Sequence, residues 1–325
     1  MLPLRDFLER HQVPLYFCAV LLAAALAIAQ PAMAANLEQA INPALALMLY
    51  LTFFQVPMTE LKRAFGRLRF LAALLLTNFL LVPALVAGLL PLLPPDPLLR
   101  LGVLMVLLCP CIDYVVTFSH LGRGDARLLL AATPMLLVVQ MLLLPAYLGL
   151  FLGSEAALLV RAGPFLDAFL WLILVPLLCA AVSQAALARA GAHAPARQAS
   201  RLLGLLPVPA TALVLFIVIA AVVPQLGLSL PAVRQVVPVY IAFALCAPAL
   251  GWLAGRLLRL PPAEGRALAF SAGTRNSLVI LPLVLAIPGA LPLLPAVVLT
   301  QTIVELLGEL LYIRLIPLLG RQREH

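Results

Sequence analysis

Apolar stretches of about 20 residues, the length that a helix needs to cross a hydrocarbon core of about 30 Å, recur along the chain. The chain has 325 residues, of which 64% are hydrophobic and 10% charged, which is more apolar surface than one soluble core can bury. We therefore predict an all-α integral membrane protein with ten transmembrane helices in a single domain over residues 1–325. The predicted spans are 13–34, 43–58, 70–93, 101–119, 128–152, 164–188, 203–224, 236–258, 267–286 and 293–318.

Lysine and arginine are divided unequally between the two sides that the ten spans imply. Seventeen of the 21 lie on alternate loops and tails, and only Arg100, Arg161 and Arg234 lie on the other side. Loops rich in Lys and Arg stay in the cytoplasm, so we expect a multi-pass protein of the cell or inner membrane with both termini cytoplasmic. The net charge of +8 is then a matter of topology, and we expect no nucleic-acid partner.

The first apolar run ends at Ala32-Met33-Ala34, which resembles the small-residue cleavage site of a signal peptide. Removal of this run would leave nine spans and spoil the alternation of loop charge. The segment before it also contains Asp6 and Glu9, whereas a signal peptide begins with a basic region. We therefore interpret the run as the first span. The short Ala-rich segment 189–201 is expected to be a loop that joins two halves of the chain.

Two segments that lie 165 residues apart resemble each other, which suggests an internal repeat. Pro83–Gly88 in the third span is similar to Pro248–Gly255 in the eighth. Because each copy would contain five spans, the second copy would enter the membrane from the opposite side. We predict two inverted five-helix repeats, at about 13–152 and about 164–318.

The fourth and ninth spans each contain a stretch that is poorly suited to a continuous helix. Cys109–Asp113 includes Pro110, which has no backbone N–H. The same separation carries this stretch onto Thr274–Leu278, which overlaps the polar stretch Ser271–Ser277 of the ninth span. Proline kinks are common in membrane helices for packing reasons alone. The matched positions and a charge in each stretch nevertheless favour two broken helices that cross at a polar cavity near the membrane midplane.

Asp113 and Arg275 are the charges on the two predicted breaks. An ionisable group in a bilayer costs a few kcal/mol, so such groups are commonly paired or functional. We expect an ion pair between Asp113 and Arg275. The sequence leaves open whether this pair is structural or responds to a substrate or a proton.

Glu305 and Glu309 lie one helical turn apart on the tenth span and therefore share a face. Two carboxylates this close are compatible with a proton carrier. In the alternative interpretation, Glu309 approaches the cytoplasmic side and Arg314 neutralises part of its charge. Cys109 and Cys111 are small fillers more often than ligands, and no His is near enough to complete a metal site. We expect no metal, no cofactor and no catalytic residue, because the chain has no Walker loop, Rossmann fingerprint or zincin motif.

From Cys111 to Asp125, the fourth span and the turn after it resemble the bile acid:sodium symporter superfamily, and its arsenite-permease branch is the most similar. Asn78 with Pro83 in the third span, Phe270–Ser277 in the ninth and the ten-span arrangement are also similar to this superfamily. The resemblance implies a panel domain of spans 1, 2, 6 and 7. It further implies a core domain of spans 3 to 5 and 8 to 10, whose relative movement gives alternating access. The position of Cys111 carries a functional cysteine in the arsenite-permease branch.

The chain departs from the superfamily at positions that bear on coupling and substrate. Sodium-coupled members have Glu and Gln where this chain has Ser271 and Arg275, and a Ser-Asn pair where it has Val115 and Val116. A fixed cation at Arg275 can take the place of a sodium ion, so we expect coupling to a proton or to no ion. Arsenite permeases carry a key glutamate where this chain has Leu278.

We predict a secondary transporter, not an enzyme, that exports arsenite or a related metalloid by alternating access. The thiol of Cys111 supports this substrate because trivalent arsenic is thiophilic. A positive Arg275 at a half-helix favours the alternative, an organic-anion symporter coupled to sodium or protons; an intramembrane enzyme is less favoured. The predicted partners are this solute and membrane lipid. The predicted binding residues are Asn78, Cys111, Asp113, Thr117, Thr274, Arg275, Asn276, Ser277 and Glu305.

Overall fold

The computed structural model describes residues 2–55, 66–112, 114–153, 167, 170–190, 194–224, 230–285, 287 and 293–320. The regular structure in these ranges is helical, with two π-helices (η1 and η3) and two 3-10 helices (η2 and η5) among the α-helices. The elements are α1 (Leu2–Ala29), α2 (Pro31–Ala35), α3 (Glu38–Phe54), α5 (Leu68–Leu76), η1 (Thr77–Leu81), α6 (Val82–Leu89), η2 (Leu90–Leu92), α7 (Pro97–Leu107), α8 (Tyr114–Leu121), α9 (Ala126–Leu152), η3 (Leu170–Leu174), α12 (Val175–Ala190), α13 (Ala194–Leu203), α14 (Pro207–Val222), α15 (Leu230–Leu257), α16 (Pro262–Gly273), α17 (Ser277–Leu285), α18 (Leu293–Leu315) and η5 (Ile316–Leu318).

Every span predicted from the sequence contains helix. Within the described residues, five helical segments are long and apolar enough to cross a membrane. These segments are His11–Ala29, Leu68–Leu92, Ala126–Leu152, Leu230–Leu257 and Leu293–Leu318. The other predicted spans contain shorter helices, and two of them are interrupted near their middle.

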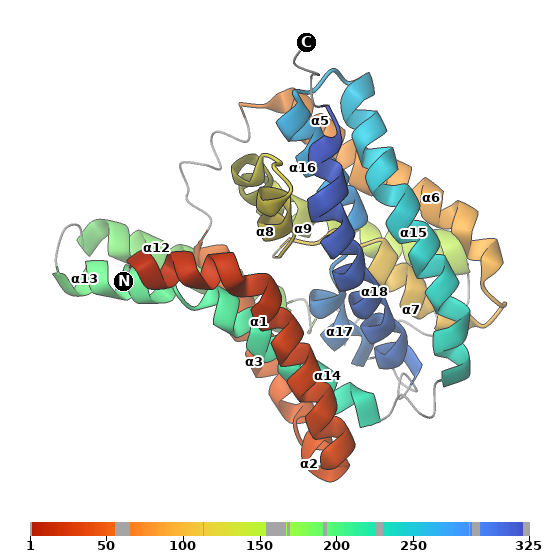
Figure 1. The fold of residues 1–325 in the computed structure, drawn as a ribbon, viewed down its shortest axis with the longest axis horizontal. Helices are drawn as coiled ribbons and strands as arrows, with labels where there is room; N and C mark the ends of the chain where they lie inside the picture. Colours follow the sequence, from red (N-terminus) through yellow and green to blue (C-terminus); the bar gives the residue numbers. More distant parts are fainter. Residues whose placement is uncertain are drawn as a thin grey trace.

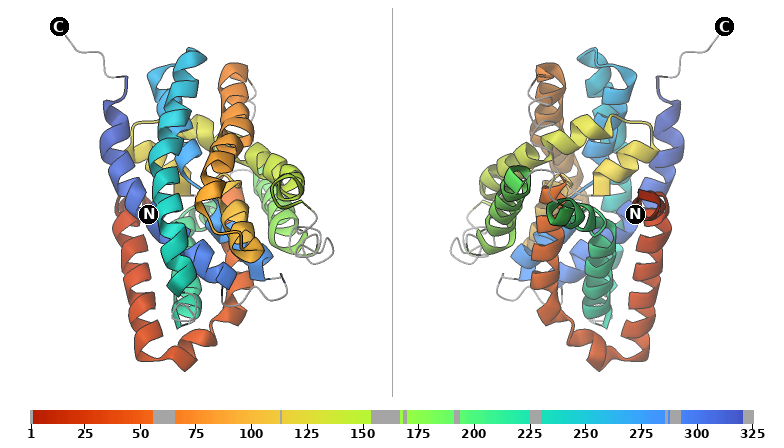
Figure 2. Two further views of the ribbon diagram at one scale, coloured as in Figure 1. Left: turned by 90° about the vertical axis from the view of Figure 1, so that its right-hand side faces the viewer. Right: turned by 90° about the vertical axis from the view of Figure 1, so that its left-hand side faces the viewer.

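The helices form two bundles that lie side by side (Figures 1 and 2). The panel bundle consists of α1, α2, α3, α12 and α14, in which α3 and α14 pack together and α1 and α12 flank them. The core bundle consists of α5 to α9 and α15 to α18, with α15 packed along both α16 and α18. A hydrogen bond from Thr117 Oγ1 on α8 to Gln12 Oε1 on α1, 2.8 Å long, joins the two bundles. This division follows the panel and core grouping that the family resemblance implies.

Two aspartates begin helices of the core bundle. The Asp96 carboxylate accepts the Leu99 N–H at 3.0 Å at the start of α7, and Asp125 accepts the Leu128 N–H at 3.0 Å at the start of α9. Each carboxylate satisfies an amide that has no partner within the helix, and it also places a negative charge at the positive end of the helix dipole. These caps fix where α7 and α9 start.

The segment 189–201, expected to be a loop, is instead largely helical. The end of α12 and most of α13 occupy it. Alanine, the best helix former, recurs through this segment. The prediction of a loop was wrong because polar composition was given more weight than helix propensity.

Helices α15 and α16 make a close contact at Gly251. A Cβ atom at this position would lie 2.8 Å from the Ala272 Cβ, 2.8 Å from the Leu268 carbonyl oxygen and 3.0 Å from the Ala269 Cα. Two of these three atoms belong to the backbone and cannot move aside as the end of a side chain can. Gly251 therefore allows α15 to support the helix that leads into the second break.

We expect Gly251→Ala to destabilise the protein by about 1–3 kcal/mol, the usual cost of overpacking. Gly149→Ala on α9 is the matched control, because a Cβ atom added at Gly149 would have no heavy atom within 4 Å. Thermal unfolding of the purified proteins in one detergent measures both effects. The G149A midpoint should equal or exceed that of the wild type. Equal midpoints for G251A and G149A would contradict the close contact.

Candidate functional site

Two helices of the core bundle are interrupted, and both interruptions lie where the sequence predicts them. Helix α7 ends at Leu107 and α8 begins at Tyr114, while α16 ends at Gly273 and α17 begins at Ser277. Pro110 lacks the N–H that would continue the first helix. Both interruptions are deep in the core bundle, where the described residues are almost completely buried.

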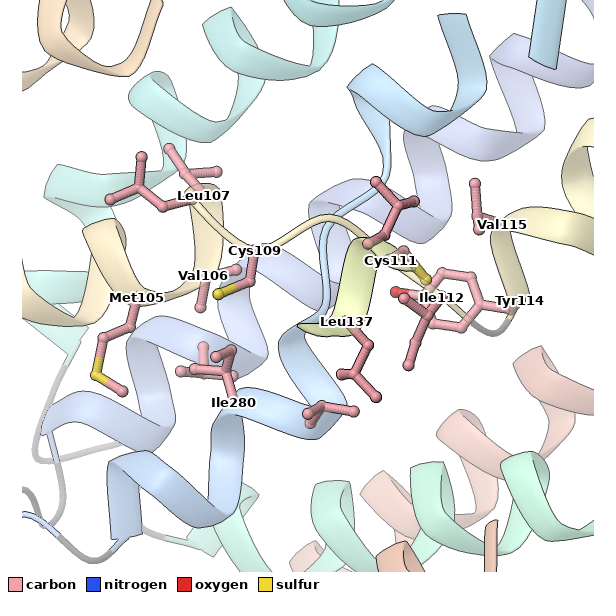
Figure 3. Close-up of a cluster of buried hydrophobic side chains, with 14 of the residues drawn as sticks. Met105, Val106, Leu107, Cys109, Cys111, Ile112, Tyr114, Val115, Leu137 and Ile280 are labelled. Carbon is pink, nitrogen blue, oxygen red and sulfur yellow. The ribbon is translucent and has the colours of Figure 1, made fainter. Parts of the chain in front are cut away.

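The two interrupted segments cross and pair through their backbones. Pro110 and Arg275 form an isolated antiparallel bridge. The Cys111 N–H donates to the Thr274 carbonyl at 3.1 Å, and the Asn276 N–H donates to the Cys109 carbonyl at 2.8 Å. Each break therefore satisfies backbone groups that the other has freed, in a region without bulk water. Figure 3 shows Cys109 and Cys111 on this extended chain, with their sulfur atoms apart and pointing in different directions.

The Arg275 guanidinium occupies the centre of the crossing and is fully buried, with 0% of the residue exposed. Its Nη2 donates to Asn78 Oδ1 at 2.9 Å, to the Ala272 carbonyl at 2.8 Å and to the Ser271 carbonyl. Its Nη1 lies 3.4 Å from the Leu107 carbonyl. The charge thus lies at the C-terminal ends of both α16 and α7, where helix dipoles favour a cation.

Glu305 on α18 provides the counter-charge on the other side of the crossing. Its carboxylate accepts the Arg275 backbone N–H at 2.7 Å, the Tyr114 hydroxyl at 2.5 Å and the Gln301 amide at 2.5 Å. Three donors to one carboxylate are the arrangement that stabilises its charged form when it is buried. On its other face the guanidinium lies 5.5 Å from the centre of the Phe243 ring, which adds a cation–π contact.

Asn78 is presented by the π-helix η1. It accepts from Arg275 and donates to Ser271 Oγ at 2.9 Å. Pro83, shortly after, cannot donate to the carbonyl four residues before it, which is that of Phe79. The Tyr147 hydroxyl donates to this carbonyl instead. The wider π-turn is thus a local consequence of Pro83, and it turns the amide of Asn78 toward the crossing.

Asn276 and Ser277 lie at the start of α17. Asn276 Oδ1 lies 3.4 Å from the Val279 N–H, in the position of a helix cap, and Ser277 Oγ accepts from Thr302 Oγ1 of α18 at 2.9 Å. Their polar atoms are therefore used to begin α17 and to join it to α18. The Asn276 Nδ2 is buried and has no hydrogen-bond partner in the described part of the chain.

The structure does not bring all the predicted residues together. Asn78, Cys111, Thr274 and Arg275 meet at the crossing with Glu305. Thr117 does not join them, because the turn of α8 directs its hydroxyl to Gln12 across the boundary between the bundles.

The predicted ion pair and the alternative for Glu309 have different outcomes. Asp113 lies outside the described residues, so its pairing with Arg275 stays a prediction. Glu309 is fully buried, with 0% of the residue exposed, whereas Arg314 is exposed. Its Oε1 lies 2.5 Å from Thr274 Oγ1. Glu309 therefore contacts the second break, in contrast to the alternative in which it approaches the cytoplasmic side and Arg314.

A gap too small to hold a water molecule lies beside the crossing, between α7, α15, α16 and α18. Its wall is mainly apolar and includes two polar groups of α18, the Gln301 amide and the Glu305 carboxylate. The lining residues are Leu107, Tyr240, Phe243, Ala244, Gly273, Gln301, Val304 and Glu305. Among the described residues, no three His, Cys, Asp or Glu side chains form a group suited to a metal ion.

Apart from Asn78, the side chains that contact the two central charges were not predicted as site residues. Gln301 lies four residues before Glu305, so the period of one helical turn was the available signal. Tyr114 and Phe243 gave no comparable signal, because their contacts depend on how distant helices cross. Ser271 lies in the polar stretch that the sequence marks as the second break.

A comparison with protein families identifies the chain. The model of the Sodium Bile acid symporter family matches residues 42–229, more than half of the chain. The chain belongs to the sodium bile acid symporter family. It is a multi-pass membrane protein and a membrane transporter of this family, in agreement with the resemblance at Cys111–Asp125. The first break lies within the matched residues, whereas Arg275 and Glu305 lie beyond them. A search of the curated proteins gave no match.

We expect Arg275→Gln alone to cost about 3–5 kcal/mol of stability, because it leaves the Glu305 carboxylate as an unpaired buried charge. The double variant R275Q/E305Q should be more stable than R275Q. Thermal unfolding in detergent measures this difference, and R234Q, at an exposed arginine, is the control. A double variant that is no more stable than R275Q would show that the two charges do not compensate each other.

Proposed function

We propose that this protein is a secondary transporter that exports arsenite or a related metalloid by alternating access. The observation that carries the proposal is the position of Cys111, a buried cysteine whose backbone is bonded to Thr274 at the crossing. A thiol at this point offers a soft ligand beside oxygen and nitrogen groups, and the sulfur of Cys109 points in a different direction.

We further propose that the chain spans the membrane ten times as two inverted five-helix repeats. The two breaks support this arrangement, since α7 with α8 and α16 with α17 hold equivalent places in the two halves of the sequence. The panel and core bundles are the two bodies whose relative movement would give alternating access. The distribution of basic residues supports cytoplasmic termini in the cell or inner membrane.

The hydrogen bonds of Arg275 favour an uncharged solute over an organic anion. The guanidinium already donates to Asn78 and to carbonyl groups at the ends of two helices. An anion that bound Nη2 would displace these partners and leave helix ends unsatisfied, whereas the buried Nε–H has no hydrogen-bond partner among the described residues. Glu305 supplies a negative charge beside it, so this pair of charges is neutral in sum. Arsenite is chiefly the uncharged acid at neutral pH, and it suits such a site.

The chemistry of capture follows from the thiol. Cys111 can form one arsenic–sulfur bond while one arsenic–oxygen bond breaks. The thiol proton leaves with the released hydroxide as water, so oxidation states do not change. A single thiol holds the metalloid reversibly, as transport requires, whereas the bonds of several thiols would retain it.

Sodium coupling is disfavoured by the same arginine. Hard cations such as sodium bind to clusters of oxygen ligands, and the cluster formed by the carbonyls of Ser271, Ala272 and Leu107 with Asn78 Oδ1 already holds the guanidinium. We propose that Arg275 serves as a permanent cation in this position. Transport would then depend on protons or on the solute gradient alone.

In cells that lack their own arsenic pumps, the wild-type protein should confer resistance to arsenite, and Cys111→Ala should abolish it. Cys246→Ala is the matched control, because this cysteine is exposed on α15 and away from the crossing. Growth at graded arsenite concentrations, with membrane expression measured for each variant, gives the readout. If the wild type gives no protection against arsenite, the metalloid is excluded as the substrate. Uptake of a labelled bile acid with and without sodium would then test the organic-anion alternative.

A further inference from the structure

Glu309 is a buried carboxyl group that the proposed transport site does not use. It lies one turn beyond Glu305 on α18, and both residues face the second break. Within the described residues, its Oε1 has one hydrogen-bond partner, Thr274 Oγ1 at 2.5 Å, and its Oε2 has none. A carboxylate with one hydrogen bond and no exposure to water is poorly stabilised as an anion.

The hydrogens available at Thr274 favour a protonated Glu309. The Thr274 hydroxyl lies 2.7 Å from the Phe270 carbonyl as well as 2.5 Å from Glu309. A hydroxyl carries a single hydrogen, and a carbonyl oxygen only accepts. Both short contacts are satisfied together when Thr274 donates to Phe270 and the acid proton of Glu309 is donated to Thr274. An ionised Glu309 would leave one of the two contacts without its own hydrogen.

Glu305 differs from Glu309 in each of these respects. It accepts three hydrogen bonds, from Tyr114, Gln301 and the Arg275 backbone, and it lies near the guanidinium. Two neighbouring buried carboxyl groups seldom share the same charge state, because ionisation of one opposes ionisation of the other. The surroundings assign the negative charge to Glu305 and the proton to Glu309.

The other titratable groups around Glu309 are few in the described structure. Tyr312, on the same helix, donates its hydroxyl to the Ala244 carbonyl of α15. Tyr240 of α15 donates to the Val297 carbonyl, and Cys109, after α7, is buried near Arg275. Arg275 follows Thr274 in the chain, and the hydrogen bonds of its guanidinium are directed to Asn78 and to the helix ends. Among the described residues, Thr274 is therefore the one partner of the Glu309 acid.

We propose that Glu309 is a proton-binding site, linked through Thr274 to the pairing of the two breaks. The Thr274 carbonyl accepts the Cys111 N–H, so one residue connects the acid of α18 to the segment that carries the thiol. Loss of the proton places an uncompensated anion in the core bundle. Release therefore requires that the crossing opens and admits water. The use of this proton for coupling rests on the transport function proposed above, whereas its presence does not.

Infrared spectroscopy of the purified full-length protein tests the site directly. A protonated carboxylic acid has a carbonyl stretch above the amide bands. At neutral pH, the wild type and the control Glu38→Gln should show this band, and Glu309→Gln should lose it. Glu305→Gln should retain it, because the residue removed is an anion. An unchanged band in E309Q, or its loss in E305Q alone, would overturn the proposal.

Coupling is tested in vesicles that contain the same proteins and a pH-sensitive dye. An arsenite gradient should drive a proton flux in the opposite direction with the wild type and with E38Q, and this flux should be lost in E309Q. If the wild type moves arsenite without a proton flux, the proposed coupling is contradicted and the proposed transport function is not. If the wild type moves no arsenite, the metalloid proposal fails, and the infrared band still decides whether Glu309 holds a proton.

Discussion

The backbone pairing of the two interrupted helices is the interaction on which the rest of this structure depends. An interrupted helix inside a membrane has amide and carbonyl groups with no water to receive them, and each unsatisfied group costs several kcal/mol. Here Cys109 and Cys111 in one break and Thr274 and Asn276 in the other exchange these bonds. Either break without the other would leave these backbone groups without hydrogen-bond partners. The two halves of the core bundle are therefore tied together at the point where polar side chains gather.

Arg275 completes what the backbone pairing leaves unsatisfied. Helices α7 and α16 both end at the crossing, and the carbonyls at their ends carry partial negative charge. One guanidinium reaches both ends, while Glu305 binds the amide of the same arginine. A single residue thus ends two helices and brings in a counter-charge through its own backbone.

Sequence reasoning found the parts of this site that carry a local signal. Pro110 marks the first break, Gly273 and the polar residues after it mark the second, and a charge within an apolar span directs attention to Arg275. Sequence reasoning could not predict which residues the side chains of Thr117 and Glu309 contact. Thr117 meets α1 and Glu309 meets Thr274 because of how helices far apart in the chain pack, and no local pattern records that packing. The helix α13 was missed for a different reason, since its alanine content was a signal that was available.

In the proposed site, the two glutamates of α18 have different roles: Glu305 holds a fixed charge and Glu309 exchanges a proton. A site that holds its charge by hydrogen bonds keeps its geometry when the solute leaves, and Glu305, with three donors, has this property. A carboxyl group that exchanges a proton must be stable in its protonated form when the crossing is closed and in its ionised form when the crossing is open. Glu309 has this property, because it has a single hydrogen-bond partner among the described residues. Because Thr274 belongs to the break, opening the crossing removes that partner. The proton and the movement of the helices are then controlled by one contact.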